Sequence, residues 1–287
     1  MKHYFKKSAV VAALIQLLFF SSKGWTEPLP VFVSIAPQKY FVERIGGNEV
    51  SVEVMVKAGE SPATFNPNPK KLSRLANAKL FFSIGVPFER IWLPRVKAIQ
   101  PDLKIIPLNR DIPRDKKLHS KTHSPKEGDP HIWTNPLLAK TMSAKIESAL
   151  SKERPEKEDY FKGNHLALCL ELDKLDQEIR KIISKGKVRN FMVFHPAWSY
   201  FAKAYGLQQI SIEREGKEPG PRALHEIINR GKKLQIKVIF VQKQFNLSVA
   251  KKVAKMIGAT VQVMDPLAEQ YIENMRQTAR AISGEKH

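Results

Sequence analysis

Short apolar runs alternate with amphipathic stretches along the whole chain, and each apolar run has the length of a β-strand. In the first half these runs are VFVSIAP (31–37), VSVEVMV (50–56), KLFFSIG (79–85) and LKIIPL (103–108). In the second half they are NFMVFHP (190–196), LQQISI (207–212), KVIFVQ (237–242) and TVQVMDP (260–266). Strands that alternate with helices predict parallel sheets flanked by helices. The sequence therefore predicts an α/β protein of two lobes, each with its own parallel-type sheet.

A long helical pattern separates the two sets of strands. Over residues 155–185 apolar side chains recur at helical spacing, at Tyr160, Leu166, Leu170, Leu172, Leu175, Ile179, Ile182 and Ile183. A helix of this length extends about 45 Å, because each residue adds 1.5 Å. We therefore expect an N-terminal lobe over 25–151, one long linking helix over 152–186 and a C-terminal lobe over 187–287.

The first 24 residues have the features of a cleaved signal peptide. A basic start, MKHYFKK, precedes an apolar run over 8–20, and small residues follow it. This run is too short to span a bilayer comfortably, which favours a signal peptide over the alternative of an uncleaved membrane anchor. The single cysteine, Cys169, lies far from the leader and cannot carry a lipid at the mature N-terminus. We therefore expect export to the periplasm, and one cysteine also excludes an internal disulfide framework.

The strong positive charge does not indicate a nucleic-acid-binding protein. The formal net charge is +20, and four of the lysines belong to the predicted leader. The remaining basic residues are spread along helical stretches, with no basic motif interleaved with aromatic residues and no groove-reading module. We interpret the charge as a basic, solvated surface of an exported protein.

Two polar residues with metal-ligand chemistry follow apolar strands in the second half. His195 in VFHP and Asp265 in VMDP each come directly after such a run. Ligands of open α/β sheets bind beyond the carboxyl ends of the strands, so these side chains are predicted to share one edge. In the first half, His131 in GDPHIW lies between Pro130, which restricts the backbone, and the apolar anchor Trp133.

Two imidazoles and one carboxylate form a donor set that suits zinc, or manganese or iron if further oxygen ligands join. Each residue also has an alternative structural role. A lone histidine is often a core or surface residue, and an aspartate before a proline is often a helix cap. Spacing alone leaves both interpretations open.

Four segments carry a resemblance to a known family: ESPATFNPNP, GDPHIW, VFHPAWSYFAKAYGL and VMDPLA, in this order behind the leader. The chain resembles the zinc- and manganese-binding periplasmic proteins of metal ABC transporters, the cluster that includes the zinc-uptake binding protein. The resemblance implies two α/β lobes, a rigid linking helix and one metal ion in the cleft. It also implies delivery to an inner-membrane permease. On this pattern His131 and His195 are histidine ligands and Asp265 is the carboxylate ligand, and we expect a monomer.

The first histidine ligand of that family is missing, because Ala63 stands at its position in SPATFNP. Water or a nearby Glu60, His119 or His123 is one candidate for the open coordination position. A weaker or different metal, or an altered ligand with a sensing or storage role, are the other two explanations. Three further carboxylates near a strand end either supply a ligand or bind nothing: Glu213, Glu215 and Glu218.

The main alternative function is a metal-dependent hydrolase. Three protein ligands with an open fourth position is the arrangement of catalytic zinc, in which a bound water becomes the nucleophile. The sequence contains neither the H-E-x-x-H motif nor the G-x-S-x-G motif of hydrolases. We therefore expect a binding protein and not an enzyme.

Overall fold

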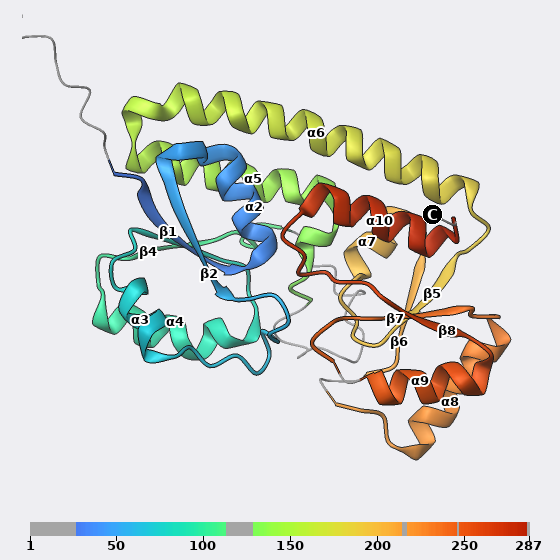
Figure 1. Cartoon of the computed structure of the whole chain (residues 1–287). Helices are drawn as coiled ribbons and strands as arrows, with labels where there is room; N and C mark the ends of the chain where they lie inside the picture. Colours follow the sequence, from blue (N-terminus) through green and yellow to red (C-terminus); the bar gives the residue numbers. More distant parts are fainter. Residues whose placement is uncertain (1–26, 113–128, 214–216, 246, 286–287) are drawn as a thin grey trace, which may run out of the picture.

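The computed structural model describes residues 27–112, 129–213, 217–245 and 247–285. The predicted signal peptide (1–24) lies outside these residues, as do His119, His123 and Glu215. The described chain forms two α/β lobes that lie side by side beneath a long helix (Figure 1). Within these ranges, no helix combines the length and the apolar character that crossing a membrane requires.

The first lobe is built on a four-stranded parallel sheet. Its order is β2-β1-β3-β4, so that the first strand lies inside the sheet. The strands are β1 (Leu29–Ile35), β2 (Val50–Val56), β3 (Leu80–Ser83) and β4 (Lys104–Pro107). The flanking elements are α2 (Ala36–Gly46), η1 (Gly47–Glu49), α3 (Pro69–Leu75) and α4 (Pro87–Ile99). The central strand β1 is buried along almost its whole length, as its continuous apolar run predicts.

The second lobe repeats this arrangement. Its sheet has the order β6-β5-β7-β8, again parallel throughout. The strands are β5 (Asn190–Val193), β6 (Gln208–Ser211), β7 (Val238–Val241) and β8 (Thr260–Val263). The helices are α7 (Ser199–Ala204), α8 (Pro221–Lys233), α9 (Leu247–Ile257) and α10 (Tyr271–Ser283). The two sheets confirm the predicted α/β fold class, including the parallel direction of the strands.

Between the two sheets the chain forms a hairpin of two helices. A 3-10 turn, η3 (Ile132–Thr134), leads into α5 (Pro136–Glu153), and η4 (Pro155–Lys157) leads into α6 (Glu158–Lys185). The side chain of Asn135 accepts hydrogen bonds from the backbone N–H groups of Leu137 and Leu138. This cap, followed by a proline in the first turn, starts α5 directly after the segment that carries His131.

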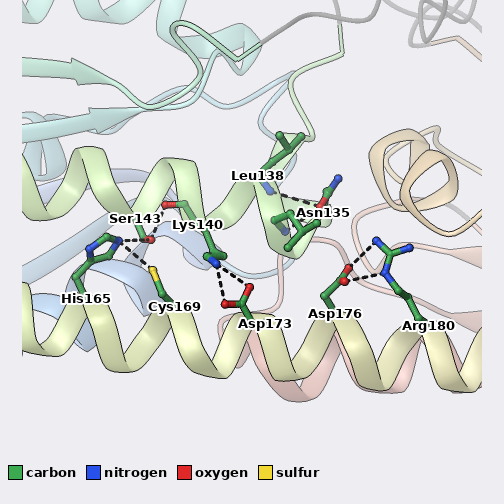
Figure 2. A network of polar contacts seen from close by, with 10 residues as sticks. Asn135, Leu138, Lys140, Ser143, His165, Cys169, Asp173, Asp176 and Arg180 are labelled. Atoms are coloured by element: carbon green, nitrogen blue, oxygen red, sulfur yellow. Dashed lines mark hydrogen bonds and ion pairs between the residues drawn. The ribbon is translucent and has the colours of Figure 1, made fainter.

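The long helix α6 contacts both lobes. Its 28 residues correspond to about 42 Å. Toward the first lobe it packs on α2 and α5, and toward the second lobe on α10. Lys140 of α5 forms an ion pair with both carboxylate oxygens of Asp173, at 2.7 and 2.8 Å (Figure 2). Arg276 of α10 holds Glu178 at 2.9 Å, so one helix connects the two halves of the molecule.

The apolar pattern of α6 is only partly a core pattern. Leu172, Leu175, Ile179 and Ile183 are buried. Tyr160, Leu166 and Leu170, which the same pattern includes, are exposed by 46%, 63% and 63%. The first half of the helix covers the core with Phe161 and Leu168 instead.

Candidate metal site

The edge of the second sheet brings His195 and Glu213 together. Both residues lie two positions beyond the carboxyl end of a strand, and the last residues of these neighbouring strands, Val193 and Ser211, are paired in the sheet. The backbone N–H of Glu213 donates to the carbonyl of Phe194, which extends the pairing by one step. As a result, Nδ1 of the His195 ring lies 3.0 Å from Oε2 of Glu213, whose side chain is buried. The strand register therefore places a carboxylate against the ring.

His131 is held by a carboxylate two residues before it. Oδ1 of Asp129 accepts from the backbone N–H of His131 at 2.9 Å and lies 2.6 Å from Nδ1 of its ring. The second carboxylate oxygen, Oδ2, accepts from the hydroxyl of Ser199 in the second lobe at 2.6 Å. Trp133 is buried, as expected for an apolar anchor. The short segment before α5 thus has a fixed geometry.

The two histidine rings lie next to one another, edge to face, across the contact between the lobes. Their centroids are 5.4 Å apart, and the rings are inclined at 70°. A zinc ion bound to two imidazole nitrogens at about 2.1 Å and a tetrahedral angle requires a centroid separation of about 5 Å. In both rings Nδ1 faces a carboxylate, so donation from Nδ1 makes Nε2 the nitrogen that carries the lone pair. Metal-binding histidines commonly have this carboxylate partner.

Aromatic groups border the histidine pair. The ring of Phe245 stacks on His195 with 5.2 Å between centroids and an angle of 22°. Trp133 lies against His131 at 5.1 Å. The amide of Gln242 donates to the carbonyl of His195 at 3.1 Å, which fixes the backbone at this position. Rings and backbone together restrict the directions in which the imidazoles point.

Asp265 lies beyond the carboxyl end of β8, in the same sheet as His195. Its Oδ1 accepts from the backbone N–H of Leu267 at 2.9 Å, which closes a turn and does not cap a helix, because the next helix, α10, begins only at Tyr271. The next residue, Pro266, accepts a hydrogen bond from Nε1 of Trp133 at 2.8 Å, so this segment touches the first lobe close to His131. Among the described residues, no three His, Cys, Asp or Glu side chains form a cluster that holds a metal ion. The structure brings the two histidines together but does not close a three-residue site with Asp265.

The other candidates among the described residues, Glu60 and Glu218, are not part of this pair. Oε2 of Glu60 accepts from the backbone N–H of Lys57 at 2.7 Å, so the carboxylate closes its own turn. Ala63 is exposed, and its backbone N–H donates to Ser61 Oγ at 3.3 Å. Glu218 is exposed as well. His119, His123 and Glu215 lie outside the described residues and stay predictions.

Sequence reasoning missed the groups that orient the histidines. The sequence pattern indicates Glu213 only as a possible ligand and indicates no role for Asp129 or Ser199. The strand-end rule that selects His195 also selects Glu213, which comes two residues after the next strand. The link between Asp129 and Ser199 spans 70 residues and has no comparable local signal.

Two α/β lobes, a long helix that contacts both of them and an adjacent pair of histidines at the lobe contact are typical of metal-binding solute-binding proteins. The protein-family comparison agrees with this class. The family model described as the periplasmic component A of the zinc-uptake complex, ZnuA, matches residues 31–284. The chain belongs to this family of periplasmic zinc-binding solute-binding proteins.

Curated relatives and solved structures support the assignment. The chain is 26% identical to the zinc-binding lipoprotein AdcA of Streptococcus pneumoniae (strain ATCC BAA-255 / R6), over 96% of this chain and 60% of the relative. It is 30% identical to the zinc-binding protein AdcA of Streptococcus pyogenes serotype M3 (strain ATCC BAA-595 / MGAS315), over 83% of this chain and 50% of the relative. The chain thus spans half to three fifths of the length of these relatives.

A crystal structure of ZnuA superimposes with a TM-score of 0.84 at 36% identity, and the match covers 90% of this chain and 98% of that chain. This similarity confirms the two-lobed fold over nearly the whole described chain. Members of the family are metal-binding transport proteins and not enzymes. The prediction of a binding protein is confirmed, and the hydrolase alternative has no support.

Proposed function

We propose that the protein captures a zinc ion in the periplasm between His131 and His195 and delivers it to an inner-membrane permease of an ABC transporter. The observation that carries the proposal is the pair of adjacent imidazoles, whose ring centroids are 5.4 Å apart and each of which has a carboxylate at Nδ1. Both rings are thereby prepared to offer Nε2 to one ion. The zinc-binding relatives named above support the choice of metal.

Zinc fits this donor set better than manganese, and the zinc-binding relatives favour zinc over iron, which also binds imidazole. Imidazole nitrogen is a preferred zinc ligand, whereas manganese and magnesium favour sites dominated by oxygen. Asp129 and Glu213, the carboxylates nearest the rings, contact the histidine nitrogens. An oxygen-rich site would need these or other carboxylates to turn toward the ion.

Asp265 is the third ligand in this proposal. Its Oδ1 is engaged by Leu267, so Oδ2 is the atom assigned to the ion. A water molecule takes the position that corresponds to Ala63, because a methyl group cannot coordinate a metal. All the proposed protein ligands come from one chain, so a monomer is sufficient for capture.

The test is a zinc titration of the purified chain in competition with a chromogenic chelator, combined with elemental analysis. We expect one zinc ion per chain. His195→Ala should lower the affinity at least about 100-fold, since it removes a ligand and its oriented donor atom. His225→Ala is the matched control, because His225 is an exposed residue of α8 whose ring lies 3.0 Å from the side-chain amide of Asn229. A wild-type chain without bound zinc, or equal affinities of the two variants, refutes the proposal.

Two further measurements extend the test to metal choice and transport. Imidazole binds metal as the neutral ring and a proton competes with the ion, so the zinc affinity is expected to fall as the pH is lowered from about 7.5 to about 5.5. An unchanged affinity at the lower pH argues against histidine ligation. Delivery to a permease is tested by zinc-limited growth of cells that carry His195→Ala in place of the wild-type chain.

A further inference from the structure

We infer that Ser199 of the second lobe positions His131 of the first lobe through the carboxylate of Asp129. On this view, the geometry of one proposed zinc ligand depends on a contact made by the opposite lobe. The inference rests on the proposed zinc-binding function for its consequence, but the positioning itself is a property of the protein without metal. Ser199 is assigned no contact with the ion.

Asp129 is a buried carboxylate with two differently engaged oxygens. Its side chain is 2% exposed. Oδ1 accepts from the backbone N–H of His131 and lies against Nδ1 of its ring, while Oδ2 accepts from Ser199 Oγ at 2.6 Å. The hydroxyl of Tyr200, also in the second lobe, donates to the backbone carbonyl of Asp129 at 3.2 Å. The residue that orients His131 is thus itself held by two consecutive residues of α7.

Ser199 is in turn fixed by its own lobe. Nε2 of Gln209, on strand β6, lies 3.3 Å from Ser199 Oγ, and Oε1 of the same side chain accepts from the backbone N–H of Trp198 at 2.7 Å. Because Gln209 donates to the hydroxyl oxygen, the hydroxyl hydrogen is directed to Asp129. The chain of contacts therefore runs from the second sheet through Gln209, Ser199 and Asp129 to the ring of His131.

The two histidines are oriented in different ways. His195 receives its carboxylate from Glu213, which belongs to the same sheet edge. The ring of His131 contacts the carboxylate of Asp129, two residues before it, and this carboxylate accepts a hydrogen bond from Ser199 of the other lobe. Removal of the Ser199 hydroxyl takes one donor from a buried carboxylate oxygen, and the loss of a hydrogen bond to a buried charge is costly. Relaxation of Asp129 is then expected to release the ring of His131 and to leave His195 in place.

The experiment compares Ser199→Ala with a conservative and a matched variant. Ser199→Thr keeps the hydroxyl. Ser143→Ala is the matched control, because Ser143 is a buried serine of α5 whose hydroxyl donates to the carbonyl of Lys140, in the network between α5 and α6 (Figure 2). The measurements are zinc affinity by chelator competition, thermal unfolding, and the nitrogen chemical shifts of the histidine rings in the metal-free chain.

We expect Ser199→Ala to lower the zinc affinity about tenfold, the lower end of the effect of groups that orient metal ligands. Ser199→Thr should restore most of this loss, and Ser143→Ala should leave the affinity unchanged. In the metal-free Ser199→Ala chain, the Nδ1-protonated form of the His131 ring should lose population, whereas the His195 ring keeps its signals.

The inference is overturned if Ser199→Ala binds zinc as the wild type does, if Ser143→Ala lowers the affinity equally, or if Ser199→Thr gives no recovery. A wild-type chain that binds no zinc refutes the proposed function instead. In that case the ring signals alone decide the inference, and unchanged His131 signals in Ser199→Ala refute it.

Discussion

The substitution Glu213→Gln separates the charge of a carboxylate from its geometry at His195. The wild-type carboxylate lies 3.0 Å from Nδ1 of the ring, and the residue is 3% exposed. Glutamine has the same length, and its amide oxygen still accepts a hydrogen bond from Nδ1. The variant therefore keeps the orientation of the ring and removes the negative charge behind it.

The expected loss follows from the role of that charge. A carboxylate at Nδ1 makes the imidazole a stronger base and hence a stronger ligand at Nε2. Removal of such a partner typically lowers metal affinity 10- to 100-fold, which corresponds to about 1.4 to 2.7 kcal/mol. Since the hydrogen bond is kept, we expect the lower end, a loss of about tenfold in zinc affinity.

The assay is chelator competition at constant pH and ionic strength, with Glu218→Gln as the control. Glu218 lies on the same connection after β6 but is exposed, so the control removes an equal charge without a histidine contact. The far-ultraviolet spectrum and the unfolding midpoint of both variants should stay close to wild type. If Glu213→Gln binds zinc with wild-type affinity, or if both variants lose the same factor in zinc affinity, the charge of Glu213 does not strengthen His195 as a ligand. Either result refutes the prediction.

Two further predictions concern stability. Trp133→Phe removes the hydrogen bond from Nε1 to the carbonyl of Pro266 and leaves that acceptor without its donor. The free energy of unfolding, measured by guanidinium titration, is therefore expected to fall by about 1 to 2 kcal/mol. An unchanged unfolding midpoint would show that this hydrogen bond does not link the lobes. A hydrogen bond from Lys157, with further help from its positive charge and from Arg154, lowers the pKa of Glu49 below its usual 4.5. A carboxylate whose pKa is lower in the folded state stabilises that state at pH values above its unfolded-state pKa, and this stabilisation is lost as the pH falls through the folded-state pKa. Glu49→Gln is therefore expected to lower the free energy of unfolding by less than about 1 kcal/mol at pH 7 and to have no effect in strong acid. A cost that is constant with pH contradicts this explanation.

The fold was largely predictable because the strand signals are local. The run VSVEVMV coincides with β2, and six of the other apolar runs contain the observed strands with two or three extra residues. Strand β1 instead begins two residues before its run, at Leu29. The long helix was predictable in position, but periodicity did not show that Leu166 and Leu170 face solvent. Which apolar side of a helix is covered depends on the elements that pack on it, and these come from distant parts of the chain.

The sequence predicted the two histidines of the pair but not the groups that orient them. His195 follows a strand and His131 follows a restrictive proline, and both signals are local. The role of Glu213 requires knowing that β6 pairs with β5, which strand order in the sequence does not reveal. The bond from the backbone N–H of Leu267 to Asp265 closes a local turn, and a strand-end rule cannot distinguish this role from metal ligation.

The single thiol has a practical consequence for spectroscopy. Cys169 is half-buried, its sulfur lies 3.3 Å from Nε2 of His165, and burial raises the pKa of the thiol above its usual value (Figure 2). Since the thiolate is the reactive form, this side chain is expected to alkylate slowly at neutral pH. A second cysteine introduced at the exposed position of Ala63 would react first. A fluorophore can then be attached at that position to follow ion capture in the otherwise native sequence.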